Sequence, residues 1–346
     1  MLTIGTDFSG IGAPEQALEK LGIEYKSVFA CDINKHAKQS FLANYNTDNW
    51  YDDITKRDHL KTPYCDLYVA GFPCQAFSIA GKRQGFNDTR GTLFFDLFQY
   101  IKLQRPKYFI LENVKGLVNH DKGNTFKTIM DSLEGLNYTI YHKVLNTKKY
   151  GLPQNRERIF IVGFRDCHNF QWPEEKELKI KIENILEGDV DEKYFLTEER
   201  IKKLQEYCHR NKENGNHHRI HSLYPRSSKT GKGGVGPLNK NDGTTYCLDT
   251  GNNQAIEFDW IGDYRTDEGL RIRKNRMSPC LTTSSTPIIK RRKIRRLTPL
   301  ECLRLQGFPD SFERVVSDSQ LYKQAGNSMT VDVMAAIIKQ VLENEN

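Results

Sequence analysis

The 346-residue chain has no long apolar run and no closely paired cysteines. No segment approaches the roughly 18 uninterrupted apolar residues of a membrane-spanning helix, and no apolar leader follows Met1. The eight cysteines are scattered without a C-x-x-C pair, which argues against a disulfide framework and a ribbon-type zinc site. We therefore expect a cytoplasmic protein with reduced thiols and no membrane partner.

Two ligand-binding motifs are incomplete. The segment GKGGVGPL resembles a phosphate-binding P-loop, but Pro237 and Leu238 stand where Lys and Ser or Thr are required. The cysteine and histidines between residues 208 and 221 fit no standard zinc-finger spacing. Neither ATP nor a metal ion is expected as a ligand.

Positive charge is concentrated in one part of the chain. The net charge is +7, but residues 208–240 and 261–300 together carry +14, which leaves −7 for the remainder. Such confinement is typical of a protein that binds a phosphate backbone, although a solvated surface would also be charged. The length favours two domains.

Strand-like and helix-like segments alternate over the first 165 residues. Runs such as LTIGTDF, YKSVFACD, DLYVAGF and KYFILENV are separated by helical patterns such as PEQALEKLG and KHAKQSFLANY. This alternation predicts an α/β fold with a mostly parallel sheet. Residues 208–290 are rich in Gly, Asn, Ser and Thr, with short β-like pieces such as TTYCLDT, and predict a loop-rich second domain. A helix capped by Thr298 and a final helix from about Met329 to Leu342 follow.

The end of the first strand has features of a nucleoside site. Gly10 and Gly12 follow the strand directly, although the third glycine of the dinucleotide-binding fingerprint is missing. Asp32 ends the second strand, where a carboxylate accepts hydrogen bonds from ribose hydroxyls. Asp53 and Ile54 follow a third strand and suit the amine and the face of an adenine. A nucleoside-containing cofactor is expected, with a plain tight turn as the alternative.

Cys74 ends the fourth strand, at the edge where open α/β sheets bind ligands. Its neighbours Pro73 and Gln75 suit a core poorly, and Glu112 ends the next strand. A thiol and a carboxyl at adjacent strand ends form a nucleophile and acid pair, although a buried thiol and a surface carboxylate are possible. Arg156 and Arg158 precede a further strand, and their spacing aims both side chains the same way.

Together, these motifs resemble the DNA cytosine-5 methyltransferases of bacterial restriction-modification systems. The segments are DFSGIGA, ACDIN, DDIT, GFPCQAFSIAG, ENV, QNRERIF, RRLTPLECLRLQGFPDSF and KQAGNSMTVDV, in the order of that family. They cover about residues 3–165 and 294–340. The resemblance implies a Rossmann-like methyltransferase fold, a catalytic domain of residues 1–185 completed by a helix at about 320–346, and a β target-recognition domain of residues 186–315.

The resemblance also implies a reaction: methyl transfer from S-adenosylmethionine to carbon 5 of a cytosine flipped out of a short specific sequence in double-stranded DNA. Cys74 would form a covalent adduct, Glu112 would hold the base and donate a proton, and Arg158, assisted by Arg156, would orient it. The implied cofactor-binding residues are Phe8, Gly10, Ile11, Gly12, Asp32, Ile33, Asp53, Ile54, Pro73, Leu93, Asn327 and Ser328. The expected DNA-binding residues are Ser78, Lys82, Arg83, Lys232, Arg295 and Arg296. We expect a monomer.

Two rival functions are open to test. A transfer-RNA methyltransferase of the same fold would carry a Cys-Phe-Thr element in the recognition region, and none occurs in this chain. A non-catalytic DNA-binding module would have lost Cys74, Glu112 or Arg158, and all three are present. One departure from the family is Cys280-Leu281, where a Thr-Leu pair is usual.

Overall fold

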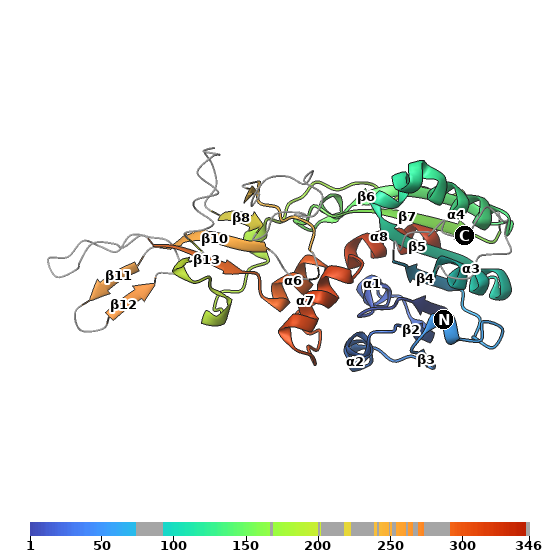
Figure 1. Cartoon of the computed structure of the whole chain (residues 1–346), viewed down its shortest axis with the longest axis horizontal. Helices are drawn as coiled ribbons and strands as arrows, with labels where there is room; N and C mark the ends of the chain where they lie inside the picture. The colour runs from blue at the N-terminus through green and yellow to red at the C-terminus, as the bar shows by residue number, and fades with distance from the viewer. Residues whose placement is uncertain are drawn as a thin grey trace.

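A computed structural model describes residues 1–73, 93–166, 169–199, 201, 218–222, 239–240, 242–248, 250, 254–260, 262–265, 269–272 and 291–343. In Figure 1 a larger α/β lobe contains both ends of the described chain, and a smaller β lobe extends from it. Helices α6 and α7 lie between the two lobes.

The larger lobe is built on a seven-stranded sheet in the order β3-β2-β1-β4-β5-β7-β6. Its strands are β1 (Leu2–Asp7), β2 (Tyr25–Cys31), β3 (Trp50–Tyr51), β4 (Leu67–Gly71), β5 (Tyr108–Val114), β6 (Thr139–Asn146) and β7 (Glu157–Phe164). β1 to β5 run parallel to one another, and β7 runs antiparallel to β5 and β6. The predicted mostly parallel sheet is confirmed. Its strand order reverses between β1 and β4, where ligands bind in such sheets.

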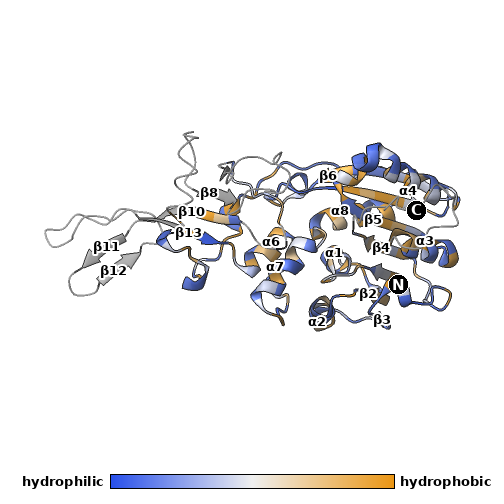
Figure 2. Cartoon of the chain, viewed as in Figure 1, coloured by the Kyte–Doolittle hydropathy of each residue, from blue (hydrophilic) through white to orange (hydrophobic). Residues whose placement is uncertain are grey.

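Helices cover both faces of this sheet. They are α1 (Ala13–Leu21), α2 (Lys35–Asn44), α3 (Leu93–Gln104), α4 (Asn124–Glu134) and α8 (Val331–Glu343), with 3-10 turns η1 (Ile54–Lys56), η2 (Lys115–Gly123) and η3 (Thr147–Tyr150). Alternate residues of β4 enter opposite cores: Val69 packs on the face of α1 and α8, and Tyr68 on the face of α3. The strands are therefore apolar on both sides, and Figure 2 colours much of β5 and β7 as hydrophobic.

The C-terminal helices return to the larger lobe. α8 packs against α1, and its apolar residues Ile337 and Ile338 are fully buried. α7 (Asp318–Asn327) precedes it, and the junction between the two helices lies beside the carboxyl ends of β1 and β4. The final helix thus begins two residues later than expected.

The smaller lobe contains a four-stranded antiparallel sheet in the order β13-β10-β8-β9 and a β11-β12 hairpin. Its strands are β8 (His218–Ser222), β9 (Asn239–Lys240), β10 (Gln254–Trp260), β11 (Gly262–Arg265), β12 (Gly269–Ile272) and β13 (Arg291–Arg296). The turns η4 (Ile182–Asn184) and η5 (Glu192–Tyr194) lead into it, and α6 (Pro299–Leu305) follows β13. The capping box between Thr298 and Glu301 confirms the predicted start of α6.

Arg295 lies inside the protein, although the sequence placed it on a DNA-binding surface. Its side chain is 3% exposed, and its two Nη atoms donate to the Glu301 carboxylate at 2.7 and 2.6 Å. A buried guanidinium with both ends engaged is not available to a phosphate. Arg295 is therefore not retained among the proposed DNA contacts.

Glu15 is a fully buried carboxyl group in the first turn of α1. Thr6 Oγ1 donates to its Oε1 at 3.3 Å, and its Oε2 has no partner among the described residues. Burial raises the pKa of Glu15 from 4.5 to about 7. The folded protein therefore holds a proton there that the unfolded chain releases at lower pH.

We expect Glu15→Gln to remove part of the pH dependence of stability. Between pH 4.5 and 7 the Glu15 carboxyl is protonated more fully in the folded than in the unfolded chain, so its contribution to the free energy of unfolding falls as pH rises, by about 3 kcal/mol in total. Glutamine does not titrate in this pH range. Urea unfolding at pH 5 and pH 8 should show that the free energy of unfolding of the variant, relative to that of the wild type, is higher at pH 8 than at pH 5. An equal difference at both values would contradict this account.

Candidate active site

A cavity of about 330 Å³ opens at the carboxyl ends of β1, β4 and β5. Its walls come from the β1–α1 turn, the starts of α2 and β7, and the α7–α8 junction. The predicted site residues that line it are Phe8, Gly10, Asp32, Pro73, Glu112, Arg156, Arg158, Asn327 and Ser328. The sheet edge thus brings together side chains that lie up to 320 residues apart in the sequence.

The β1–α1 turn depends on left-handed backbone. Phe8, Gly10 and Gly12 have φ values of 54°, 56° and 80°. A Cβ atom on Gly12 would lie 2.3 Å from the ring of Tyr45, so a side chain there would collide with the residue that follows α2. The turn therefore lies close to α2 and aims its backbone at the cavity.

Asp32 stands across from this turn. Its two carboxylate oxygens accept hydrogen bonds from the backbone N–H groups of Gly10 at 2.9 Å and Asn34 at 2.8 Å. Burial raises the pKa of Asp32, and these two donors oppose the shift. Each oxygen keeps further acceptor capacity toward the cavity, which suits a ligand with adjacent hydroxyl groups.

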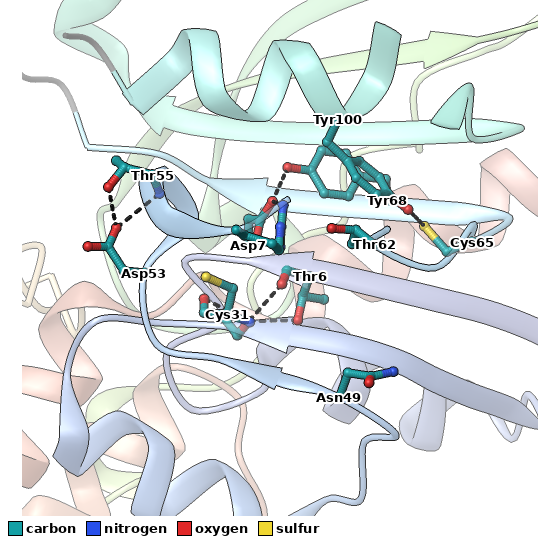
Figure 3. Close-up of polar contacts among 12 residues, drawn as sticks. Thr6, Asp7, Cys31, Asn49, Asp53, Thr55, Thr62, Cys65, Tyr68 and Tyr100 are labelled. Carbon is teal, nitrogen blue, oxygen red and sulfur yellow. Dashed lines mark hydrogen bonds and ion pairs between the residues drawn. The ribbon is translucent and has the colours of Figure 1, made fainter. Parts of the chain in front are cut away.

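The remaining predicted cofactor residues lie around this cavity without lining it. Ile11 and Ile54 are buried, one in the core on each face of the sheet. Asp53 accepts from the backbone and hydroxyl of Thr55 (Figure 3). Ile33 is 80% exposed, and Leu93 packs partly buried at the start of α3. Gly12 completes the turn described above, and cofactor contacts by these residues stay predictions.

Glu112 is the carboxyl group of the cavity. It lies next to Gly71 in the β4–β5 register and is 8% exposed. Arg158 Nε lies 3.0 Å from its Oε1. Burial raises the pKa of Glu112, while Arg158 and then Arg156 act in the opposite direction. The carboxyl is thus held in a buried site that favours its neutral form.

Arg156 and Arg158 have different surroundings. Arg156 is 3% exposed, and its Nη atoms donate to the carbonyl oxygens of Gly326 at 3.2 Å and Ser328 at 2.7 Å. It therefore ties the start of β7 to the α7–α8 junction. Only Arg158 forms an ion pair with Glu112 among the described residues.

Sequence reasoning missed Asn113, which lies beside Glu112 in the ENV motif. Its Nδ2 donates to the carbonyl oxygen of Phe72 at 2.9 Å, and its Oδ1 accepts from Val114 N–H. Asn113 thereby fixes the segment that leads into Cys74. Cys74, Ser78, Lys82, Arg83 and Lys232 lie outside the described residues.

Residues 242–248 also approach the site and were not predicted to do so. In the described part of the expected strand TTYCLDT, Thr245 forms an isolated bridge with Gln154 in place of a regular strand. Cys247 Sγ lies 3.3 Å from Arg156 Nη1 and 3.8 Å from Arg158 Nη2. A segment next to the smaller lobe therefore contacts both arginines. Other cavity residues not anticipated are Ser9, Ala13, Asn34, Ala37, Gly71, Phe72, Val114, Lys323, Gln324, Gly326 and Met329.

The part of the chain that the structure describes shows neither a membrane-spanning helix nor a cluster of metal-binding side chains. None of its helices has the length and apolar character needed to cross a membrane. Within the same residues, no group of three or more His, Cys, Asp and Glu side chains could hold a metal ion.

The chain is similar to known proteins along almost its whole length. The family model described as C-5 cytosine-specific DNA methylase matches residues 6–343. Type II methyltransferase M1.ScrFI of Lactococcus lactis subsp. cremoris is 38% identical over 97% of this chain and 77% of its own. Type II methyltransferase M.HpaII of Haemophilus parainfluenzae is 39% identical over 97% and 88%.

Solved structures share the fold. The Dnmt2 methyltransferase of S. pombe aligns with a TM-score of 0.66 at 19% identity, over all of both chains. The methyltransferase EhMeth of Entamoeba histolytica aligns with a TM-score of 0.68 at 18% identity, over 100% and 99%. These likenesses support the methyltransferase architecture of the sheet and its helices.

Proposed function

Because the chain belongs to the C-5 cytosine-specific DNA methylase family, we propose that it methylates a flipped-out cytosine through a covalent adduct with Cys74. The protein is a DNA cytosine-5 methyltransferase, and S-adenosylmethionine is its methyl donor. The observation that carries the mechanism is the pairing of the buried Glu112 carboxyl with the partly exposed Arg158 in the cavity that Pro73, the residue before Cys74, also lines. The proposal includes a monomer in the cytoplasm that acts on double-stranded DNA as the modification enzyme of a restriction-modification system.

The cavity residues fit this donor. Asp32 offers acceptor capacity to the ribose hydroxyls, and the Phe8–Gly10 turn brings backbone and an aromatic ring to the same wall. Asn327 and Ser328 also line the cavity. When bound, S-adenosylmethionine supplies an electrophilic methyl group. The cavity joins this wall to Glu112, so that a base held by Glu112 and Arg158 lies next to the donor site.

The chemistry of the chain's own residues follows from the weak nucleophilicity of carbon 5. The Cys74 thiolate forms a bond to carbon 6 of the cytosine, and electron density moves to carbon 5 as ring nitrogen 3 takes a proton from Glu112. Arg158 orients the base and stabilises the carboxylate that remains. After methyl transfer, a base removes the carbon-5 proton, the bond between carbon 6 and sulfur breaks to restore the thiolate, and ring nitrogen 3 returns its proton to the Glu112 carboxylate.

The proton-donor role of Glu112 predicts a pH profile. Its neutral form is active, so kcat should fall as pH rises through its pKa. Arg158→Met removes the cation that most opposes the raised pKa of Glu112. The alkaline limb of kcat should therefore move to higher pH, by about one unit or more, while the maximal rate falls. Arg158→Lys keeps the charge and should leave the limb near its wild-type position. A move to lower pH in Arg158→Met would contradict this assignment.

The proposed DNA contacts include Arg296 on β13 and the residues Ser78, Lys82, Arg83 and Lys232. We expect the double variant Lys82→Ala/Arg83→Ala to weaken binding to duplex DNA at low salt. If both side chains face phosphates, the slope of log affinity against log salt should become shallower by about two. Fluorescence anisotropy with a labelled duplex measures this slope. An unchanged slope and affinity would remove the loop from the DNA surface.

The proposed function is tested with labelled S-adenosylmethionine. The protein is incubated in parallel with unmethylated phage DNA and with unmodified transfer RNA, and the products are digested to nucleosides. We expect label in 5-methyldeoxycytidine from the DNA alone. Label in the RNA alone would favour the transfer-RNA enzyme, and no label in either would favour the binding module.

A further inference from the structure

A buried ion pair lies next to the Phe8–Gly10 turn, which lines the part of the cavity proposed to bind S-adenosylmethionine. Arg57 Nη1 and Nη2 donate to the two carboxylate oxygens of Asp7 at 2.6 and 2.7 Å, and neither side chain is exposed. Tyr68 donates its hydroxyl to the same carboxylate at 2.5 Å (Figure 3). The Arg57 guanidinium also lies over the rings of Phe29 and Tyr51, at 4.8 and 5.2 Å from their centroids.

The ion pair links two segments of the proposed donor site, the turn after β1 and the loop around η1. Asp7 ends β1 and is followed by Phe8, the first residue of the donor turn. Arg57 comes directly after η1, in the loop that carries Asp53 and Ile54. Tyr51, under the guanidinium, accepts a hydrogen bond through its carbonyl oxygen from the backbone N–H of Asp32 at 3.2 Å. Arg57 therefore contacts the residue before the turn directly and the proposed ribose-binding residue Asp32 through Tyr51.

Stability alone does not account for such a pair. Removing two charges from water has a large free-energy cost, and apolar side chains of similar volume often stabilise the fold as well or better. Arg57 Nε also lacks a partner among the described residues, which adds to the cost of burial. A bidentate guanidinium and carboxylate pair does supply a fixed distance and a fixed plane.

We infer that Arg57 and Asp7 are positioning residues that hold the adenosine side of the donor site in its binding geometry. The bidentate Arg57–Asp7 pair sets the distance between the Phe8–Gly10 turn and the Asp53–Ile54 loop. The hydrogen bond from Tyr68 holds the Asp7 carboxylate in the plane of the Arg57 guanidinium. This inference rests on the proposed function, since it assumes that the cavity binds S-adenosylmethionine.

The test is designed to keep the fold while removing the ion pair. In the double variant Asp7→Leu/Arg57→Met, apolar side chains of similar size replace the pair. Calorimetry without DNA should show a dissociation constant for S-adenosylmethionine at least about tenfold above the wild-type value. At saturating donor, kcat on phage DNA should stay close to that of the wild type, which separates donor binding from a general loss of active protein.

The chain offers a matched control in Arg295 and Glu301, a second buried bidentate pair that lies away from the proposed donor site. Arg295→Met/Glu301→Leu should leave the dissociation constant for S-adenosylmethionine within about twofold of the wild type, whatever its effect on stability. If the Asp7/Arg57 variant does not fold, Tyr68→Phe, which removes only one hydroxyl, should still weaken donor binding several-fold.

The outcomes are distinguishable. If the folded Asp7/Arg57 variant binds the donor as the wild type does, the inference is overturned and the proposed function stands. If that variant does not fold, the same conclusion follows from wild-type donor binding by Tyr68→Phe. Equal weakening in the Arg295/Glu301 control would overturn it too, because the effect would then be general. No binding by the wild-type protein would overturn the donor assignment itself and this inference with it.

Discussion

Cys74→Ala should lower the rate of methyl transfer by about 10⁴-fold or more, because alanine cannot add to carbon 6 and nothing else would make carbon 5 nucleophilic. Donor binding should be unchanged, since the residues that line the donor side of the cavity remain in place. Single-turnover assays with labelled donor measure the rate, and calorimetry measures donor affinity.

A second thiol provides the control. Cys302 lies on α6 and is 1% exposed in the hydrophobic core, and it is not among the cavity residues. Cys302→Ala should cost some stability and leave the rate per folded molecule near that of the wild type. A Cys74→Ala variant with more than a few per cent of wild-type activity would require a different nucleophile.

Glu112→Gln should lower kcat by about 10²- to 10⁴-fold, the range typical of losing a general acid. Glutamine matches the shape of the carboxyl group and can still hydrogen-bond the amino group and ring of the base. It has no proton to give to nitrogen 3, so the adduct would not be stabilised. The measurement is kcat at saturating donor and DNA from pH 6 to pH 9.

The pH profile is the discriminating part of this experiment. In the wild type, the neutral form of Glu112 is favoured because burial raises its pKa, and activity should decline on the alkaline side. The glutamine variant should lose that alkaline limb along with most of its rate. A variant that keeps both the rate and the limb would show that another group donates the proton.

The sequence predicts the sheet and much of the cavity because both follow from local rules. Alternating apolar strands and helices determine a parallel sheet, and the residues that end its strands meet at one edge. That rule brings Asp32, Glu112 and Pro73 to the same cavity without knowledge of the packing. Arg158 meets Glu112 for a reason that this rule does not cover: β7 runs antiparallel to β5, so the start of β7 lies at the edge where β5 ends.

Contacts that depend on packing could not be predicted in this way. Asp7 and Arg57 lie 50 residues apart, and no periodicity links a strand end to a loop residue. Arg295 belongs to a strongly basic run that suggests a surface, whereas the fold turns it toward Glu301. Thr298 predicted the start of α6, but nothing in the sequence indicated that Glu301, which completes the capping box, also binds this arginine. The approach of Cys247 to both arginines has no signal in the sequence.

The covalent step is tested most directly with 5-fluorocytosine, because fluorine cannot leave as a proton does. A long duplex is prepared with 5-fluorodeoxycytidine in place of deoxycytidine, so that every recognition site carries the analogue. With S-adenosylmethionine, the wild-type protein should form a complex with this DNA that survives denaturing electrophoresis, and Cys74→Ala should form none. Absence of the complex with the wild type, or its formation by both proteins, would contradict the account.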